Sequence, residues 1–131
     1  MLDIFAKFAT NEASEDAGVW VPFGDAKFLV ARSGNRAYSK KLSADFSKNQ
    51  MLLEAKDDTA DKVSEGIMIG VFAETILLGW EGVSYKSAPM PYSKENAKIL
   101  LAHKDFRRQV GVWADDINLY KSKEEAEQEK N

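Results

Sequence analysis

His103 is the only histidine in the 131-residue chain, and Asp105 follows two positions later. An imidazole beside a carboxylate can act as a general base, because its pKa lies near neutral pH. Such a base needs a nucleophile, but no serine stands in a G-x-S-x-G type of motif and cysteine is absent. A lone histidine near Phe106 and Val110 is more often a packing or helix-capping residue. We therefore expect no catalytic residues and no enzymatic activity.

Four carboxylates lie close together in the sequence, at Asp57, Asp58, Asp61 and Glu65. On a helix, Asp61 and Glu65 share one face and could offer oxygen ligands to a divalent cation. The cluster lacks the alternating ligands and the glycine of a calcium loop. Carboxylates are also common in the first turn of a helix, where they interact favourably with its dipole. We favour this second interpretation and expect neither a bound metal nor a cofactor.

Basic residues are concentrated only at Lys40–Lys41, Lys48 and Arg107–Arg108. Eighteen basic residues stand against 21 acidic ones, which gives a net charge of −3 and a pI of about 5.2. A protein that binds nucleic acid needs a surplus of Lys and Arg to displace counterions. The charge balance therefore argues against a nucleic-acid partner.

A chain of this length is the size of one domain, and its 44% hydrophobic and 30% charged residues are typical of a globular protein. Asp3 stands where a secretory signal would carry positive charges. The most apolar run, residues 66–80, is shorter than the roughly 20 residues that span a bilayer. We expect no membrane association and a location in the cytoplasm.

Two β-rich runs, within residues 18–32, flank Gly24-Asp25. This pattern predicts a β-hairpin, since glycine accepts a positive φ in a tight turn. Pro22 lacks an N–H group and favours a strand end or a sheet edge. We expect Trp20 and Phe23 to lie at an exposed edge of this hairpin and to be available to a partner.

Helical periodicity dominates the rest of the chain. Residues 36–47 carry an apolar residue every fourth position, and Asn35 before them is the expected N-cap. The run that begins at Asp57 is apolar nearly all round in its middle, which predicts a central buried helix reaching about Trp80. Ser93 opens a further helical stretch, with a break near residues 103–105.

These elements predict one compact domain over residues 1–120, mainly α with a small N-terminal β-hairpin (α+β) near residues 18–32. Residues 121–131 contain no large apolar side chain, so a helix there would have nothing to bury. We expect them to form a flexible charged C-terminal tail.

An apolar seam follows the last predicted helix at Val110, Trp113, Ile117 and Tyr120. The nearly heptad spacing permits two interpretations. The seam can pack on the central helix as core, or it can extend beyond the domain and bind a partner helix or a second copy. Large aromatic residues are common anchors of interfaces. All four residues are therefore candidates for partner binding, together with Trp20 and Phe23.

The order of these stretches resembles the tail assembly chaperones of long-tailed, non-contractile (lambda-like) bacteriophages and prophages. The resemblance lies in the hairpin Gly18-Val19-Trp20-Val21-Pro22 with Phe28-Leu29-Val30-Ala31-Arg32, in Trp80-Glu81-Gly82-Val83, in the helix start Tyr92-Ser93-Lys94-Glu95-Asn96, and in the charged end of the chain. It extends from about residue 18 to the C-terminus. These motifs concern packing and turns, and none is a catalytic signature.

The resemblance implies a chaperone that binds the long tape measure protein and keeps it soluble during tail assembly. It implies self-association, a site of action in the host cytoplasm, and absence from the mature virion. In such families a ribosomal frameshift often produces a longer form, whose extra domain recruits the tail tube protein. Apolar surface that accepts amphipathic helices is consistent with this role.

Two other functions are compatible with the sequence. A structural protein of the virion, such as a tail completion or connector protein, would share the small mixed fold and the lack of catalytic motifs. A small enzyme would depend on His103 and nearby carboxylates.

Overall fold

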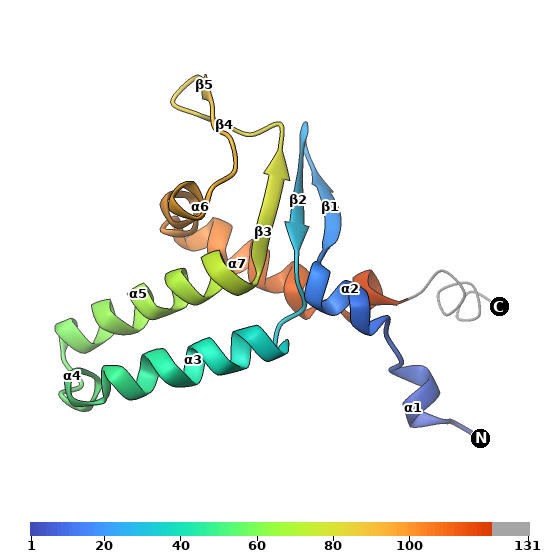
Figure 1. Cartoon of the computed structure of the whole chain (residues 1–131), viewed down its shortest axis with the longest axis horizontal. Helices are drawn as coiled ribbons and strands as arrows, with labels where there is room; N and C mark the ends of the chain where they lie inside the picture. Colours follow the sequence, from blue (N-terminus) through green and yellow to red (C-terminus); the bar gives the residue numbers. More distant parts are fainter. Residues whose placement is uncertain (122–131) are drawn as a thin grey trace.

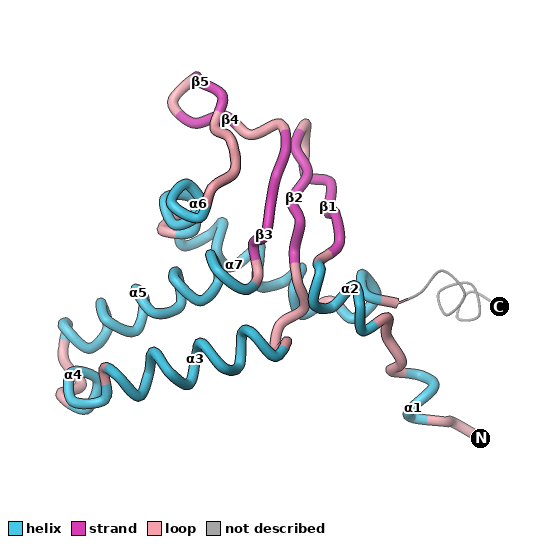
Figure 2. Tube along the Cα trace, in the orientation of Figure 1, coloured by secondary structure: helices cyan, strands magenta, loops and turns pink. Residues whose placement is uncertain are grey.

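The computed structural model describes residues 1–121. A three-stranded sheet and a short two-stranded hairpin stand beside a set of helices, so the fold mixes helix and strand, in agreement with the expected α+β class (Figure 1). Figure 2 shows that the three-stranded sheet forms one upright layer, from whose lower end two long helices project side by side. The predicted flexible tail lies, apart from Lys121, outside the described residues.

The main sheet has three antiparallel strands in the order β1-β2-β3. They are β1 (Val19–Phe23), β2 (Ala26–Val30) and β3 (Leu77–Glu81). The predicted hairpin is present, with Gly24 at a φ of 60° in its turn. It is not a separate two-stranded ribbon, however, because the second edge of β2 pairs with β3, and Phe28 stands opposite Trp80.

The prediction that the central helix reaches Trp80 was wrong at its C-terminal end. Helix α5 (Asp58–Thr75) stops five residues earlier, and β3 begins at Leu77. The carbonyl of Ile76 accepts a hydrogen bond of 2.8 Å from the amide of Ala31, so the backbone already pairs with the chain that follows β2. A buried helix and a buried strand are both continuous apolar runs, and periodicity alone does not separate them.

Helix α3 (Arg36–Lys48) and α5 lie side by side and are connected through the short α4 (Gln50–Glu54) (Figure 1). The side chain of Asn35 accepts a hydrogen bond from the amide of Tyr38, as the predicted N-cap requires. The side chain of Asp57 accepts a hydrogen bond from the amide of Ala60 at the start of α5. Each cap satisfies one backbone donor that the helix itself leaves unpaired.

The C-terminal third adds a short hairpin and three helical segments. These are β4 (Ser84–Tyr85), β5 (Ala88–Pro89), α6 (Lys94–Leu101), α7 (Lys104–Asp115) and the 3₁₀-helix η1 (Ile117–Tyr120). Ser93 caps α6 and a break occurs at His103, both as predicted. The predicted apolar seam does not follow one helix, because α7 ends at Asp115.

The N-terminal segment contains two short helices, α1 (Ile4–Lys7) and α2 (Glu12–Ala17), and neither has a buried residue. Asn11 connects this segment to the body, because its amide donates a 2.7 Å hydrogen bond to the carbonyl of Tyr120.

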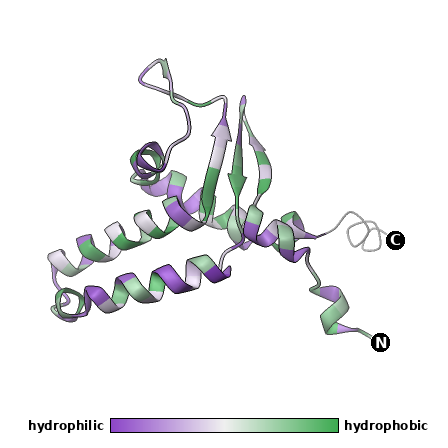
Figure 3. Cartoon of the chain, viewed as in Figure 1, coloured by the Kyte–Doolittle hydropathy of each residue, from purple (hydrophilic) through white to green (hydrophobic). Residues whose placement is uncertain are grey.

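The core lies where the sheet meets α5, α6 and α7. Its buried residues include Val21, Phe28, Val30, Ile76, Leu77, Trp80, Leu101 and Val110. Figure 3 shows hydrophobic residues along β2, β3 and α5, while much of α3 is hydrophilic. Within residues 1–121, no helix is both long enough and apolar enough to cross a membrane.

Candidate functional site

An apolar groove lies between the β1–β2 hairpin and helices α6 and α7, and its volume is about 810 Å³. It is lined by Phe23, Phe28, Val83, Tyr85, Ile99, Leu100, His103, Asp105, Phe106 and Gln109. Most of these side chains are apolar or aromatic. These ten residues are called the apolar groove below.

The floor of the groove is an aromatic cluster centred on Phe28. Strand alternation places Phe28 on the same sheet face as its cross-strand partners Val21 and Trp80. Its ring centroid lies 5.4 Å from that of Phe106 and 5.7 Å from that of Trp113. Phe28 is only 6% exposed, so close packing holds the floor in place.

The rim of the groove consists of large apolar side chains that remain about half exposed. The exposed fractions are 49% for Phe23, 48% for Ile99 and 42% for Tyr85. The ring of Phe23 meets Trp113 edge-on, with a centroid separation of 5.3 Å and an interplanar angle of 77°. Contiguous exposed apolar surface of this kind is typical of a site for another molecule.

Three polar side chains, His103, Asp105 and Gln109, lie at the edge of the groove. Asp105 forms an exposed ion pair of 3.2 Å with Arg108. His103 is exposed at the start of α7 and makes no side-chain capping bond. Neither serine nor cysteine is among the ten lining residues. This arrangement is suited to binding an apolar segment and orienting it by a few polar contacts.

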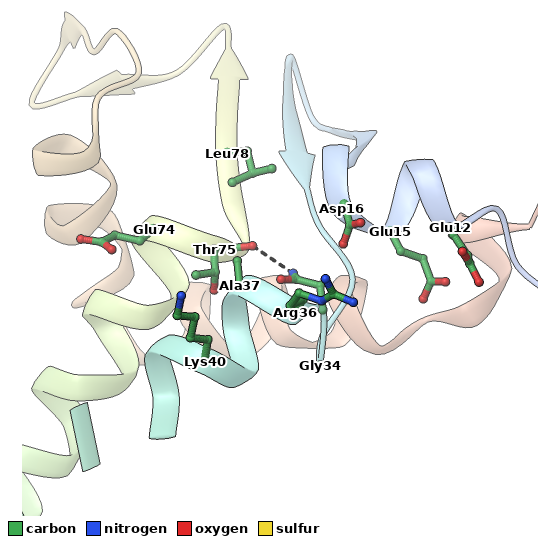
Figure 4. Close-up of a pocket in the computed structure, with 11 residues that line it drawn as sticks. Glu12, Glu15, Asp16, Gly34, Arg36, Ala37, Lys40, Glu74, Thr75 and Leu78 are labelled. Atoms are coloured by element: carbon green, nitrogen blue, oxygen red, sulfur yellow. Dashed lines mark hydrogen bonds between the residues drawn. The ribbon is translucent and has the colours of Figure 1, made fainter. Parts of the chain in front are cut away.

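A second hollow, of about 860 Å³, is polar (Figure 4). Carboxylates from α2 and Glu74 of α5 lie on either side of Arg36 and Lys40 of α3. At its base, the Nδ2 group of Asn35 donates to the carbonyl of Thr75 over 3.2 Å. Both signs of charge are mixed there, so the hollow presents no single charge to a ligand. The apolar groove is therefore the better candidate site.

The acidic cluster predicted near the start of α5 does not form a metal site in the structure. Asp57 serves as the cap of α5, and Glu65 forms an ion pair of 3.4 Å with Arg107. Among residues 1–121, no three His, Asp or Glu side chains come together as metal ligands would.

The structure brings two of the predicted partner-binding residues together, since Phe23 lies in the groove rim and contacts Trp113. Trp20 is 46% exposed but lies on the opposite face of β1. There it approaches Gly79 of β3, and the ammonium of Lys27 stands 4.7 Å from its ring centroid. Trp20 and Phe23 were expected at one exposed hairpin edge, but their side chains lie on opposite faces of the sheet.

Val110 and Tyr120 of the predicted seam are fully buried, and Ile117 is partly buried. Their burial agrees with the interpretation of the seam as core. Contact of these residues with a partner stays a prediction that the structure does not test.

Tyr120 is held by specific contacts. Its hydroxyl donates a 2.9 Å hydrogen bond to the carbonyl of Val30, and the guanidinium of Arg32 lies 5.5 Å from its ring centroid. Burial, which disfavours the charged phenolate, raises the pKa of Tyr120 to about 12, and the Arg32 charge partly opposes this shift. Tyr120 therefore connects the C-terminal segment to β2.

Sequence reasoning did not identify Phe28, Ile99 and Phe106 as groove residues. Phe28 was within the predicted hairpin, and the other two were within the helical stretch predicted to begin at Ser93. Whether these residues line a common groove depends on how α6 and α7 pack against the sheet. The available signal was weak: Ile99 lies next to two further apolar residues, Leu100 and Leu101, and three such neighbours on one helix cannot all face the core.

Comparison with known proteins gives one family. A family model described as YdaY prophage protein matches residues 32–131. Neither the curated proteins nor the solved structures gave a match. The matched range begins just after β2, so it includes α6 and α7 of the groove but not Phe23 and Phe28.

Proposed function

This chain belongs to the YdaY prophage protein family, and from this premise we propose that it is a tail assembly chaperone. In this role it binds the tape measure protein and keeps it soluble while the tail assembles. The work is binding, so we propose that the protein is not an enzyme and needs no cofactor. It would act in the host cytoplasm and be absent from the finished virion.

The observation that carries the proposal is the apolar groove with its half-exposed rim. An amphipathic helix presents apolar side chains at positions i, i+3, i+4 and i+7 along one face. The aromatic floor at Phe28 and Phe106 accepts such side chains by shape and hydrophobicity, with few polar groups that would demand one sequence. Weak contacts repeated along a long helical client gain strength through avidity.

A further part of the proposal is a frameshift-extended longer form whose additional domain recruits the tail tube protein. It is supported by the resemblance described above. Mass spectrometry of an induced prophage lysate tests it, because a longer product contains peptides that continue beyond Asn131.

The main test is co-expression with the tape measure protein of the same prophage. We expect the wild-type chain to raise the soluble fraction of the client several-fold. Ile99→Asp places a charge on the half-exposed rim without disturbing the core, and it should abolish most of this gain. The matched control is Val112→Asp, at a side chain of α7 that is 58% exposed and lies outside the groove.

An unchanged soluble fraction in the presence of the wild-type chain would contradict the proposal. If Ile99→Asp and Val112→Asp reduced the soluble fraction of the client equally, the client would bind outside the groove. Detection of the chain in stoichiometric amounts in purified virions would instead favour the alternative, a structural tail completion or connector protein.

A further inference from the structure

The N-terminal arm, residues 1–8, is the most exposed apolar segment of the described chain. The exposed fractions are 91% for Phe5, 71% for Leu2, 58% for Phe8 and 54% for Ile4. Phe5 and Phe8 are three positions apart, so they lie on one face of the helical turn α1. This turn has no buried residue, although the side chain of Asp3 caps it through the amide of Ala6.

An isolated helical turn of four residues gains little stability in water. Exposure of several large apolar side chains on it is unfavourable, since each would gain about 1.5–3 kcal/mol from full burial. The arm therefore has the properties of a segment that packs against another surface.

The groove of the same molecule is not that surface in this conformation. Figure 1 shows α1 at the end of the molecule that is remote from α6, beyond α2. The chain is fixed to the body at Asn11, whose amide bonds to the carbonyl of Tyr120. The ten residues before this point can extend over at most about 36 Å, which is sufficient to reach an adjacent molecule.

We propose that the arm packs into the apolar groove of a second copy, and that two copies exchange their arms reciprocally. The arm offers two phenylalanines and two aliphatic residues on about two turns of chain. The groove offers an aromatic floor and a volume of about 810 Å³. Every molecule carries both surfaces, so a two-fold dimer satisfies both at once.

The buried area decides between a single contact and a reciprocal one. A phenylalanine presents about 200 Å², so the exposed fractions of Phe5 and Phe8 correspond to about 300 Å² per arm. One arm with the groove surface that it covers would bury about 600 Å², which is below the size of a specific interface. Reciprocal exchange doubles this area to about 1,200 Å², the lower end of the range for specific interfaces.

In the dimer, the arm of one molecule covers the groove of the other, and a client can displace this arm. This consequence rests on the proposed function, because it assumes that the client helix occupies the same groove. Loss of the arm should then free the groove and tighten the binding of a client peptide, by about tenfold if the arm occupies most grooves in the dimer.

Sedimentation equilibrium tests the dimer. We expect the wild-type chain to show twice its 14.6 kDa mass at high concentration, and the variant Phe5→Ser/Phe8→Ser to be monomeric. Ile99→Asp should also be monomeric, since it alters the receiving groove. The matched control Met51→Ser removes an apolar side chain that is 87% exposed on α4, and it should remain dimeric.

Cross-linking tests the exchange itself, and the absence of cysteine makes single-cysteine variants specific. A mixture of Leu2→Cys and Gln109→Cys chains should form arm-to-groove adducts with a short bismaleimide. A mixture of Leu2→Cys and Met51→Cys chains should not, because Met51 lies on α4, outside the groove.

A wild-type monomer at all concentrations, or equal masses for wild type and the Phe5→Ser/Phe8→Ser variant, would overturn the proposal. Binding of a monomeric wild type to anionic lipid vesicles, lost in that variant, would overturn it in favour of a membrane-binding arm. A confirmed dimer whose groove binds no client peptide would instead overturn the proposed function and leave the exchange standing.

Discussion

Tyr120 stands where the sequence allowed either a core residue or an interface residue, and its contacts are those of a core anchor. Its hydroxyl bonds to the carbonyl of Val30, 90 positions away in the chain. Tyr120→Phe would remove this donor from a buried carbonyl, and we expect a loss of about 0.5–1.5 kcal/mol in the free energy of unfolding. Urea denaturation measures it.

The control for this experiment is Tyr85→Phe. Tyr85 is 42% exposed, so removal of its hydroxyl should change the stability by less than about 0.5 kcal/mol. Equal effects of the two substitutions would show that the Tyr120 hydroxyl contributes nothing specific.

The raised pKa of Tyr120 also leads to a prediction of how the free energy of unfolding depends on pH. The pKa of Tyr120 is raised to about 12 in the folded chain, against an ordinary value of 10.0. Between these values the unfolded chain loses the tyrosine proton and the folded chain keeps it, so the unfolded state binds fewer protons and stability falls as pH rises. The stabilising contribution is complete below pH 10 and is lost as pH rises through about 12.

The measurement is the stability difference between wild type and Tyr120→Phe as a function of pH. This difference should be constant up to about pH 10 and should then decrease toward pH 12. The subtraction removes the titration of lysines and of the other tyrosines, which both chains share. A constant difference up to pH 12 would show that burial does not perturb this group.

At the scale of elements, the end of β3 depends on a close backbone contact. Gly82 follows β3 at a φ of +77°, and a Cβ atom there would lie 2.8 Å from the carbonyl oxygen of Asp25 in the β1–β2 turn. Gly34 has the same φ, but a Cβ atom there would meet nothing within 4 Å. The two glycines share the same φ and differ in the space around them.

We therefore expect Gly34→Ala to cost about 1–2 kcal/mol, from the left-handed conformation alone. Gly82→Ala should cost about 1–3 kcal/mol more, because the methyl group forces the hairpin turn away from β3. Thermal unfolding followed by circular dichroism compares the two variants. Similar melting temperatures of the two variants would mean that the hairpin turn can shift to accommodate the methyl group at position 82 without loss of stability.

The helix starts were predictable from sequence because caps are local. Asn35, Asp57 and Ser93 each accept a hydrogen bond from an amide three residues later, and no other part of the fold is needed to recognise them. β3 was not predictable, because its pairing partner β2 is about 50 positions away. Its residue Leu77 has apolar neighbours on both sides, Ile76 and Leu78, as a residue of a buried helix would.

At the scale of the whole molecule, the groove is a product of tertiary structure. Phe28 comes from β2, Ile99 from α6 and Phe106 from α7, and only the packing of α6 and α7 on the sheet brings them together. Each of these apolar residues is visible in the sequence, but no local pattern predicts that they pack together. The predicted site therefore overlapped the observed groove at Phe23, with Trp113 behind it.

The family match and the fold have different N-terminal limits, and this difference leads to a final prediction. The match begins at residue 32, whereas β1 and β2 lie before it and supply Val21, Phe28 and Val30 to the core. Each of these side chains contributes about 1.5–3 kcal/mol by burial. Their combined loss is comparable to the whole stability of an ordinary domain, about 5–15 kcal/mol.

A chain that starts at residue 32 should therefore lack a cooperative thermal transition and a near-ultraviolet circular dichroism spectrum. Its β3 would have no strand partner, and the hydroxyl of Tyr120 would lose its acceptor on Val30. A chain that lacks only residues 1–8 removes no buried residue, so it should retain both signals and melt close to the wild type. If the shorter fragment melted cooperatively with a native-like spectrum, the matched range would be a domain in itself, and the hairpin would be an addition to it. If it does not, residues 19–30 are as necessary to the fold as the part that defines the family.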